Sequence, residues 1–184
     1  MRIARDLFNK QGYNGTGIAQ IVAKAGVTNA ALYYYVSSKQ ELLYRVLEDG
    51  MADQLEKLEG IYDVPRPAAE RLEMALNNHF DLIFHRPEAI RVFLRERRFL
   101  VGDYAERYQV RVKRYDALFE RIIVDGVASG EFTASDPRLM RLAILGMVNW
   151  VTEWYHPGGP ATDREIRSTY IRWVIQRLVA PAQK

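Results

Sequence analysis

The N-terminal part of the chain carries two short runs of helical periodicity separated by a glycine. Apolar residues recur three and four positions apart before Gly26, which predicts a helix with one buried face. Gly26 stands where a left-handed helix end suits glycine, and Thr16 and Thr28 are expected to cap the two helices. The second helix is expected to end at about residue 34 or 35. The expected core residues are Ile18, Ile21, Val22 and Ala25 in the first helix, Val27 in the turn and Leu32 in the second helix.

Beyond residue 39 the hydrophobic pattern predicts helices only, so the expected fold class is all-α. A long stripe covers residues 42–58, and the proline-containing break at 63–67 is interpreted as a linker between a head and a body. Further helices are expected near residues 72–84, 88–100, 103–128, 137–155 and 163–179, with Gly102 closing the second of these. The predicted domains are a three-helix head, residues 1–47, and a larger helical body, residues 48–184.

The second short helix has the chemistry of a DNA-reading element. Short two-helix units with a glycine in the turn place their second helix in the major groove. Asn29 can hydrogen-bond a base edge, and Ala30 or Ala31 can touch a thymine methyl group. Three consecutive tyrosines offer hydroxyl groups to phosphates, and Ser38 is expected to cap the next helix so that its free amides and Lys39 meet a phosphate. The alternative is a packed tyrosine cluster in an ordinary helical domain.

Residues 2–47 resemble the N-terminal domain of the TetR family of bacterial transcriptional repressors. The matching pieces are Ala4 to Phe8, Gly12-Tyr13, Thr16, Ile21, Ala25 to Val27, Leu32-Tyr33, Ser38-Lys39 and Glu41-Leu42. The resemblance implies a dimeric, helical repressor whose larger C-terminal part binds a small ligand. The residues that it implies for DNA contact are Thr16, Gly17, Gln20, Thr28, Asn29, Ala30, Ala31, Tyr33, Tyr34, Tyr35 and Lys39.

Three positions depart from the family pattern. Gly17 replaces the usual serine or threonine, and Ala31 stands where threonine is common, so each lacks one hydroxyl group that could meet a phosphate. Val36 replaces a frequent phenylalanine, a loss of volume that the core must absorb.

Charge adds weight to DNA binding. The 184-residue chain has a formal net charge of +3, and residues 1–47 contain six basic and two acidic residues, so the head carries +4 and the body −1. A basic head on a nearly neutral body is the pattern expected for phosphate attraction, although chance scatter could produce so small an excess.

Composition argues against several other classes of protein. The chain has no cysteine, which excludes disulfides and thiolate metal sites, and no apolar run long enough for a membrane span or a signal peptide. The expected location is the cytoplasm. His79 and His85 do not share a helical face, and His156 stands apart, so no metal site, catalytic triad or cofactor is expected. An enzyme, or a helical ligand-binding protein without DNA binding, remains a distant alternative.

The body contains two candidate ligand-binding features. Residues 146–159 resemble the C-terminal part of a TetR subgroup that responds to acyl-CoA thioesters, including repressors of fatty-acid, sterol-ring and branched-acid breakdown; the alternative for Trp150 and Trp154 is a core or dimer interface. Arginines recur in residues 91–114, either as a solvated helix face or as partners for coenzyme A phosphates. The expected ligand-binding residues are Phe80, Phe84, Phe93, Arg95, Arg98, Arg111, Tyr115, Phe119, Met147, Trp150 and Trp154.

The family resemblance also implies how two copies would assemble. The last two helices are expected to pack against those of a second copy as a four-helix bundle, and the paired heads should read a near-palindromic operator. The expected function is a repressor released by a small apolar effector, such as an acyl-CoA of fatty-acid or sterol breakdown. The alternative is a regulator of efflux or of another pathway with a non-CoA ligand. The expected seam residues are Ile166, Tyr170, Trp173, Val174 and Leu178.

Overall fold

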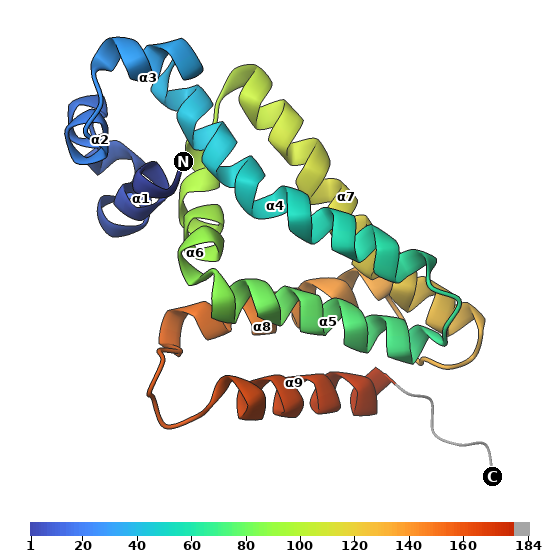
Figure 1. Cartoon of the computed structure of the whole chain (residues 1–184). Coiled ribbons are helices and arrows are strands. Elements are labelled where there is room, and N and C mark those ends of the chain that lie inside the picture. The colour runs from blue at the N-terminus through green and yellow to red at the C-terminus, as the bar shows by residue number, and fades with distance from the viewer. Residues whose placement is uncertain (179–184) are drawn as a thin grey trace. The chain divides into compact units, whose positions relative to one another are not determined.

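The computed structural model describes residues 1–178 and folds them into nine α-helices and one short 3-10 helix (Figure 1). No β-strand occurs among these residues, so the predicted all-α class is confirmed. None of the helices in this part of the chain is long and apolar enough to cross a membrane. The elements are α1 (Arg2–Gly15), α2 (Ile18–Ala25), α3 (Asn29–Tyr35), α4 (Lys39–Asp63), α5 (Ala68–His85), α6 (Pro87–Glu96), η1 (Arg97–Phe99), α7 (Gly102–Ala128), α8 (Pro137–Trp154) and α9 (Asp163–Leu178).

The helix predicted over residues 88–100 is the one that differs most from the structure. It divides into α6, which ends at Glu96, and the 3-10 turn η1, which ends at Phe99. Gly102 was expected to close this helix, but it is the first residue of α7 and adopts a φ of 57°. Glycine takes this left-handed conformation without steric cost, so the chain can turn sharply into α7. The last helix is described to Leu178, and its expected final residue, Val179, lies outside the described residues.

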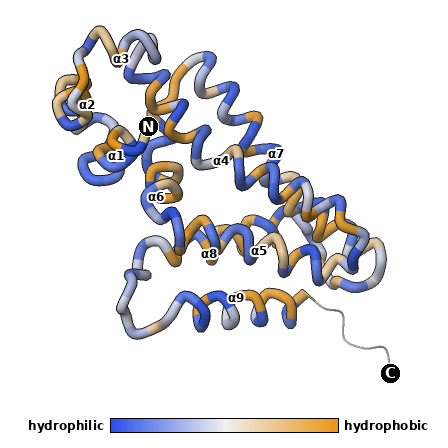
Figure 2. The backbone as a smooth tube through the Cα atoms, viewed as in Figure 1, coloured by the Kyte–Doolittle hydropathy of each residue, from blue (hydrophilic) through white to orange (hydrophobic). Residues whose placement is uncertain are grey.

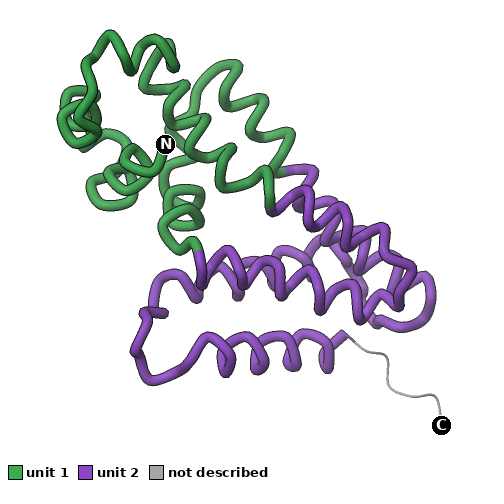
Figure 3. Tube along the Cα trace, in the orientation of Figure 1, with its two compact units in different colours: residues 1–53, 86–112 green, residues 54–85, 113–184 purple. Residues whose placement is uncertain are grey.

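The chain forms two compact units (Figure 3). The first contains residues 1–53 and 86–112, and the second contains residues 54–85 and those from 113 onward. The first unit therefore holds the predicted head together with α6, η1 and the beginning of α7. The break at residues 63–67 is present between α4 and α5, but it lies inside the second unit and does not join the two units. The predicted domain boundary at residue 47 stays a prediction.

The short helices of the first unit begin and end through local hydrogen bonds. Gly26 adopts φ 66° and ψ 29° and ends α2 as expected, and the Thr28 hydroxyl accepts from the Ala31 amide at 3.1 Å at the start of α3. The cap expected at Thr16 is wrong. Gly17 is the N-cap of α2, while Thr16 is fully buried and its hydroxyl donates to the Gly12 carbonyl at 2.8 Å, because it belongs to the end of α1.

Four of the six core residues expected in the helix-turn-helix do not lie in the core, whereas Ile21 and Val22 do. Val27 is 45% exposed, and Ile18, Ala25 and Leu32 are only partly buried. Helix α3 therefore contains no buried residue. The core of this unit comes from α1, α2, α4, α6 and the beginning of α7, and it includes Phe8 and Leu43, neither of which is exposed at all. Val36, directly after α3, is 2% exposed, so the core closes around valine at this position.

The second unit is built around α5, which packs against α8 and α9. Hydrophobic and hydrophilic positions alternate along its helices in Figure 2, as the periodicity predicts. Residues without measurable exposure come from α4, α5, α7, α8 and α9, so one core joins these helices. They are Leu58, Leu72, Ala75, Leu76, Phe80, Ile122, Ile123, Val148, Val151 and Leu178.

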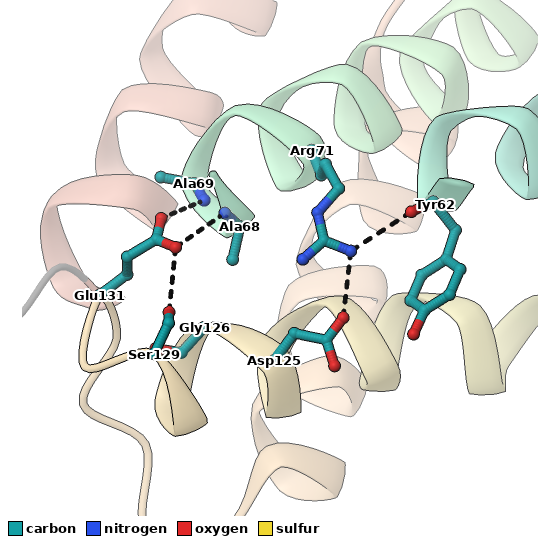
Figure 4. A network of polar contacts seen from close by, with 8 residues as sticks. All are labelled: Tyr62, Ala68, Ala69, Arg71, Asp125, Gly126, Ser129 and Glu131. Atoms are coloured by element: carbon teal, nitrogen blue, oxygen red, sulfur yellow. Dashed lines mark hydrogen bonds and ion pairs between the residues drawn. The ribbon is translucent and has the colours of Figure 1, made fainter. Parts of the chain in front are cut away.

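A polar network joins the N-terminal end of α5 to the loop that follows α7 (Figure 4). The Glu131 carboxylate accepts from the Ala68 and Ala69 amides at 3.0 and 3.1 Å and from the Ser129 hydroxyl at 3.0 Å. Burial alone would raise the pKa of Glu131, but these hydrogen bonds outweigh it and lower the pKa. A carboxylate from the loop therefore caps the first turn of α5, where unpaired amides favour an anion.

The close packing of Gly126 in α7 against the Phe132 ring can be tested by substitution. A Cβ atom at Gly126 would overlap the Phe132 ring, whereas a Cβ at Gly60, an exposed position inside α4, meets nothing. We expect Gly126→Ala to lower the free energy of unfolding by about 1–3 kcal/mol through overpacking. The matched control Gly60→Ala should raise it by roughly 0.5–1 kcal/mol, because alanine favours helix. Denaturant unfolding measures the free energy of unfolding of both variants. Equal effects of the two substitutions would contradict close packing between Gly126 and Phe132.

Candidate nucleic-acid interface and ligand-binding residues

The outer surface of α3 presents the three tyrosines to solvent. Tyr33, Tyr34 and Tyr35 are 50%, 84% and 68% exposed, so the alternative of a packed tyrosine cluster is wrong. The rings of Tyr34 and Tyr35 meet edge to face at 5.2 Å, and Asn29 is also exposed. A seven-residue helix that exposes an amide, small side chains and phenol groups can approach base edges and phosphates together.

Apart from Lys39 on α4, the other residues predicted for DNA contact lie on α2 and in the turns on either side of it. Gly17, Gln20 and Thr28 are exposed, and the Gln20 side-chain oxygen accepts from the Gly17 amide at 2.9 Å. Thr16 is the exception, because its buried hydroxyl is bonded to the chain itself. Its side chain is therefore not on the surface that α3 presents, and its predicted role in direct side-chain contact needs correction. The contacts predicted for the remaining residues stay predictions.

The start of α4 has the expected form of an anion-binding helix end. The Ser38 hydroxyl accepts from the Glu41 amide at 3.0 Å, so the predicted cap is confirmed. The Glu41 carboxylate accepts from the Ser37 amide and hydroxyl, both at 2.7 Å, and pairs with Arg45 at 2.6 Å. The hydrogen bond from the Ser37 amide is the largest of several causes that lower the pKa of Glu41 to about 2. The carboxylate therefore stays ionised, and Arg45 balances its charge. It lies beside the first turn of a helix whose positive end can meet a phosphate.

Lys39, the predicted phosphate ligand, has an aromatic neighbour that could not be predicted from the sequence. Its Nζ atom lies 4.2 Å from the centroid of the Tyr13 ring. Partial burial lowers the pKa of Lys39. In the sequence, Gly12-Tyr13 is only one of the pieces that match the family pattern. This match does not reveal which distant residues contact the Tyr13 ring.

The predicted ligand-binding residues fall into two groups, one in each compact unit. Phe93, Arg95, Arg98 and Arg111 belong to the first unit, and the other seven belong to the second. In the second unit Phe80 and Phe84 stack at 5.5 Å, and the buried rings of Tyr115 and Phe119 lie 5.4 Å apart. The second unit therefore contains an aromatic interior, as predicted, and its role in ligand binding stays a prediction.

The arginines of the first unit have their own partners. Arg111 pairs with Glu48, with 2.8 Å between Nε and Oε1. Burial raises the pKa of Glu48 and the neighbouring Arg111 opposes that shift. Arg98 lies over the Phe99 ring at 5.0 Å, and Arg95 is exposed. A phosphate group that bound Arg111 would therefore compete with Glu48.

The two tryptophans of α8 lie on the outside of the second unit. Trp150 is 65% exposed and Trp154 is 42% exposed, and both share a helical face with the exposed Leu139 and Leu142. The opposite face of α8 is buried. In this single chain the tryptophans therefore do not line the interior, which favours the alternative of a dimer interface. Met147 is partly exposed.

The predicted dimer seam on α9 is mostly internal. Ile166, Val174 and Leu178 are buried within the second unit. The Tyr170 ring meets the Phe80 ring edge to face, with 6.0 Å between the ring centroids. Only Trp173, which is 50% exposed, points to solvent among the predicted residues. The family resemblance implied these residues as a seam between two copies, but most of them are used for packing inside the chain. The exposed apolar surface lies on α8 instead.

His79 forms a buried polar contact between α5, α7 and α8. Its Nδ1 atom lies 2.9 Å from the Tyr115 hydroxyl, and its Nε2 atom lies 2.9 Å from Asn149 Oδ1. Because Asn149 Oδ1 only accepts, we assign the proton to Nε2, and Nδ1 then accepts from Tyr115, whose pKa is raised by burial. Burial also lowers the pKa of His79. Within residues 1–178 no group of three or more His, Cys, Asp and Glu side chains could hold a metal ion.

His79 should make stability depend on pH. Its lowered pKa in the folded chain means that the unfolded chain takes up the proton more readily below about pH 6.5, the ordinary histidine value. This contribution to stability is complete above that pH and should be lost progressively as the pH falls below it, with a slope of at most about 1.4 kcal/mol per pH unit. We expect His79→Gln to flatten this slope in thermal unfolding, and His156→Gln, at an exposed position, to leave it unchanged. An unaltered slope in His79→Gln would contradict the assignment.

Two family models match the chain. Residues 1–46 match the model of bacterial regulatory proteins of the tetR family, and residues 65–178 match the tetracyclin repressor-like C-terminal domain.

Two curated relatives cover most of the chain. The HTH-type transcriptional repressor KstR2 of Mycolicibacterium smegmatis is 24% identical over 180 residues, which cover 95% of this chain and 86% of that protein. The fatty acid metabolism regulator protein of Bacillus subtilis is 26% identical over 153 residues, which cover 82% of this chain and 79% of that protein.

Two solved structures have a similar fold. AibR in complex with isovaleryl coenzyme A and operator DNA gives a TM-score of 0.88 at 26% identity and covers 95% of both chains. The ketosteroid transcriptional regulator KstR2 of Mycobacterium tuberculosis gives a TM-score of 0.88 at 22% identity, covering 98% of this chain and 93% of that one. At 22% identity the second likeness shows the fold alone.

Proposed function

The chain belongs to the TetR family of bacterial regulatory proteins, and from this membership we propose that it is a DNA-binding transcriptional repressor released by an acyl-CoA. The observation that carries the proposal is the surface of α3, where Asn29 and three tyrosines are exposed and no side chain is buried. If the rings served packing, they would be buried in the chain's own core. Their exposure leaves them available to contact an operator.

We assign different roles to the exposed side chains of this surface. Asn29 reads a base edge, because its amide can donate and accept together, and the small side chains of Ala30 and Ala31 let the helix come close. The tyrosine hydroxyls and Lys39 hold phosphates and set the register on the duplex. Because Gly17 and Ala31 offer no hydroxyl group, the tyrosines and Asn29 carry a larger share of the contact.

The acyl-CoA proposal rests on relatives and on the aromatic interior of the second unit. AibR, which resembles this chain over nearly its whole length, was solved with isovaleryl coenzyme A and operator DNA, and another relative regulates fatty acid metabolism. The rings of Phe80, Phe84, Tyr115 and Phe119 supply apolar surface for an acyl chain. The repressor would act in the cytoplasm, where its operator is, without catalysis. A regulator with a non-CoA apolar ligand is the alternative.

We further propose that the chain works as a homodimer that pairs through the outer face of α8. Four large apolar side chains are exposed on this face, and Trp173 of α9 is exposed as well. In a two-fold dimer the same patch meets itself, and tryptophan is enriched in such interfaces. The two copies of α3 could then contact half-sites about one helical turn of DNA apart.

DNA binding and effector class can be tested in one gel-shift experiment on the DNA upstream of the gene for this protein. We expect a shifted band that weakens steeply with salt and that isovaleryl-CoA or a longer acyl-CoA releases, because the effector and the operator favour different states of one protein. Free coenzyme A is the control. Release by apolar compounds but by no acyl-CoA would favour the alternative ligand, and the absence of any shift would refute the proposal.

The assignment of contacts on α3 predicts two different mutant phenotypes. Tyr33→Phe should weaken binding to all sequences to a similar degree, because it removes a phosphate contact. Asn29→Ala should instead change which base is preferred at one operator position, at a cost of about 1–3 kcal/mol for the original sequence. Binding selection from a randomised duplex pool measures both. If the two variants select the same sequences, the division between base and phosphate contacts is wrong.

The proposed dimer face predicts a change in mass. Trp150→Glu should place a charge in the interface and give monomers in sedimentation analysis, with weaker binding to a palindromic duplex because the two heads no longer act together. The control is Val110→Glu on α7, where the original side chain is equally exposed at 66% but does not lie on α8 or α9. A dimeric Trp150→Glu protein would exclude this face as the interface.

A further inference from the structure

Tyr13 connects three elements of the first unit at a break in α1. Gly12 adopts φ 73° and ψ 167° inside this helix, a conformation that suits glycine. The Tyr13 amide that follows the break donates to Glu96 Oε2 of α6 at 2.7 Å. Glu96 is only 7% exposed. Because a buried carboxylate is costly without hydrogen bonds, this short bond ties the end of α6 to α1.

The Tyr13 ring is a platform for the Lys39 ammonium group. The ring lies 5.6 Å from the Phe8 ring and stacks on Phe99 of η1 at 5.7 Å with an angle of 20° between the planes. Lys39 Nζ lies 4.2 Å from its centroid. A cation over a tyrosine face is attracted by the ring electrons, so the position of this ring influences where the ammonium group rests.

Gln40 joins the same ring to the segment between α6 and α7. Its Nε2 donates to the Tyr13 hydroxyl at 3.0 Å and to the Phe99 carbonyl at 2.8 Å, while its Oε1 accepts from the Val101 amide at 3.3 Å. One amide side chain therefore uses both hydrogens and its oxygen to hold the chain on either side of Leu100. Gln40 also follows Lys39 directly in the first turn of α4.

We propose that Gln40 is a positioning residue that ties Lys39, through Tyr13, to the junction of residues 97–101. A displacement of this junction would then move the ammonium group away from a phosphate and weaken DNA binding. α7 continues from the junction through Ala128 into the second unit, so the junction lies on a continuous path along the chain between the two units. The inference rests on the proposed DNA binding for its consequence, although the position of Lys39 can be measured without DNA.

The first experiment uses the full chain without DNA. The Tyr13 ring should shift the NMR signals of the Lys39 ε-methylene protons upfield, compared with the exposed Lys10. We expect Gln40→Leu to bring the Lys39 signals close to those of Lys10. Gln40→Asn, whose shorter side chain cannot reach all three partners, should do the same if the leucine variant fails to fold. Gln109→Leu, at an exposed position of α7, is the control.

The second experiment is a double-mutant cycle on a duplex selected by the wild-type chain. Lys39→Met should reduce the slope of log affinity against log salt by about 0.9 for each phosphate that the variant no longer neutralises. Gln40→Leu should reduce this slope similarly and weaken binding by about 2- to 30-fold. The double variant should bind no more weakly than Lys39→Met alone, because Gln40 acts through Lys39.

The outcomes separate this inference from the proposed function. Additive effects in the cycle, or an unchanged Lys39 signal in both Gln40 variants, would overturn the positioning role. A stabilising role without positioning would lower the melting temperature and leave the salt slope unchanged. The wild-type chain could bind no DNA while the Lys39 signal still moved in the Gln40 variants. That result would support the positioning role of Gln40 and refute the proposed function.

Discussion

The first unit depends on how α3 is held, because this helix has no buried residue of its own. A seven-residue helix is far too short to be stable alone, so its position must come from its two ends. At the N-terminal end the left-handed Gly26 turn and the Thr28 cap set its direction. At the other end the buried Val36 and the capped start of α4 fix the chain. A helix anchored only at its ends can expose nearly all of its surface, which a DNA-reading element requires.

The start of α4 combines two demands that usually conflict. In the proposed DNA contact it would offer free amides and a cation to a phosphate, and it would also have to be held firmly enough to set the register. The structure separates the demands among neighbouring side chains, because Glu41 is bound to Ser37 and Arg45, while Gln40 is bound to Tyr13 and the η1 junction. Lys39 then rests on an aromatic ring and forms no short ion pair with a carboxylate among the described residues. An ammonium group held in this way keeps its charge available for an incoming phosphate.

The same sequence pattern had different consequences on α8 and α9. Both helices carry apolar residues at helical spacing, and the pattern could not reveal which apolar face meets its own chain and which meets a partner. The structure packs Ile166 and Val174 of α9 inside the second unit and leaves Trp150 of α8 outside. Likewise, Thr16 is a chemically reasonable helix cap, but the end of α1 uses its hydroxyl first. Local propensity was correct in kind at these positions, and competition between neighbouring elements decided the outcome.

Sequence alone determined the all-α class, the helix-turn-helix with its Gly26 turn, the Thr28 and Ser38 caps, and the exposed polar-aromatic character of α3. These features depend on residues within one or two helical turns of each other, so their physics can be read from spacing and side-chain chemistry. Only the tertiary structure decided that Tyr13 meets Glu96, Gln40 and Lys39, and that His79 meets Tyr115 and Asn149. Most of these partners are separated by tens of residues, and their contacts exist only because the core packs the helices that carry them in one arrangement.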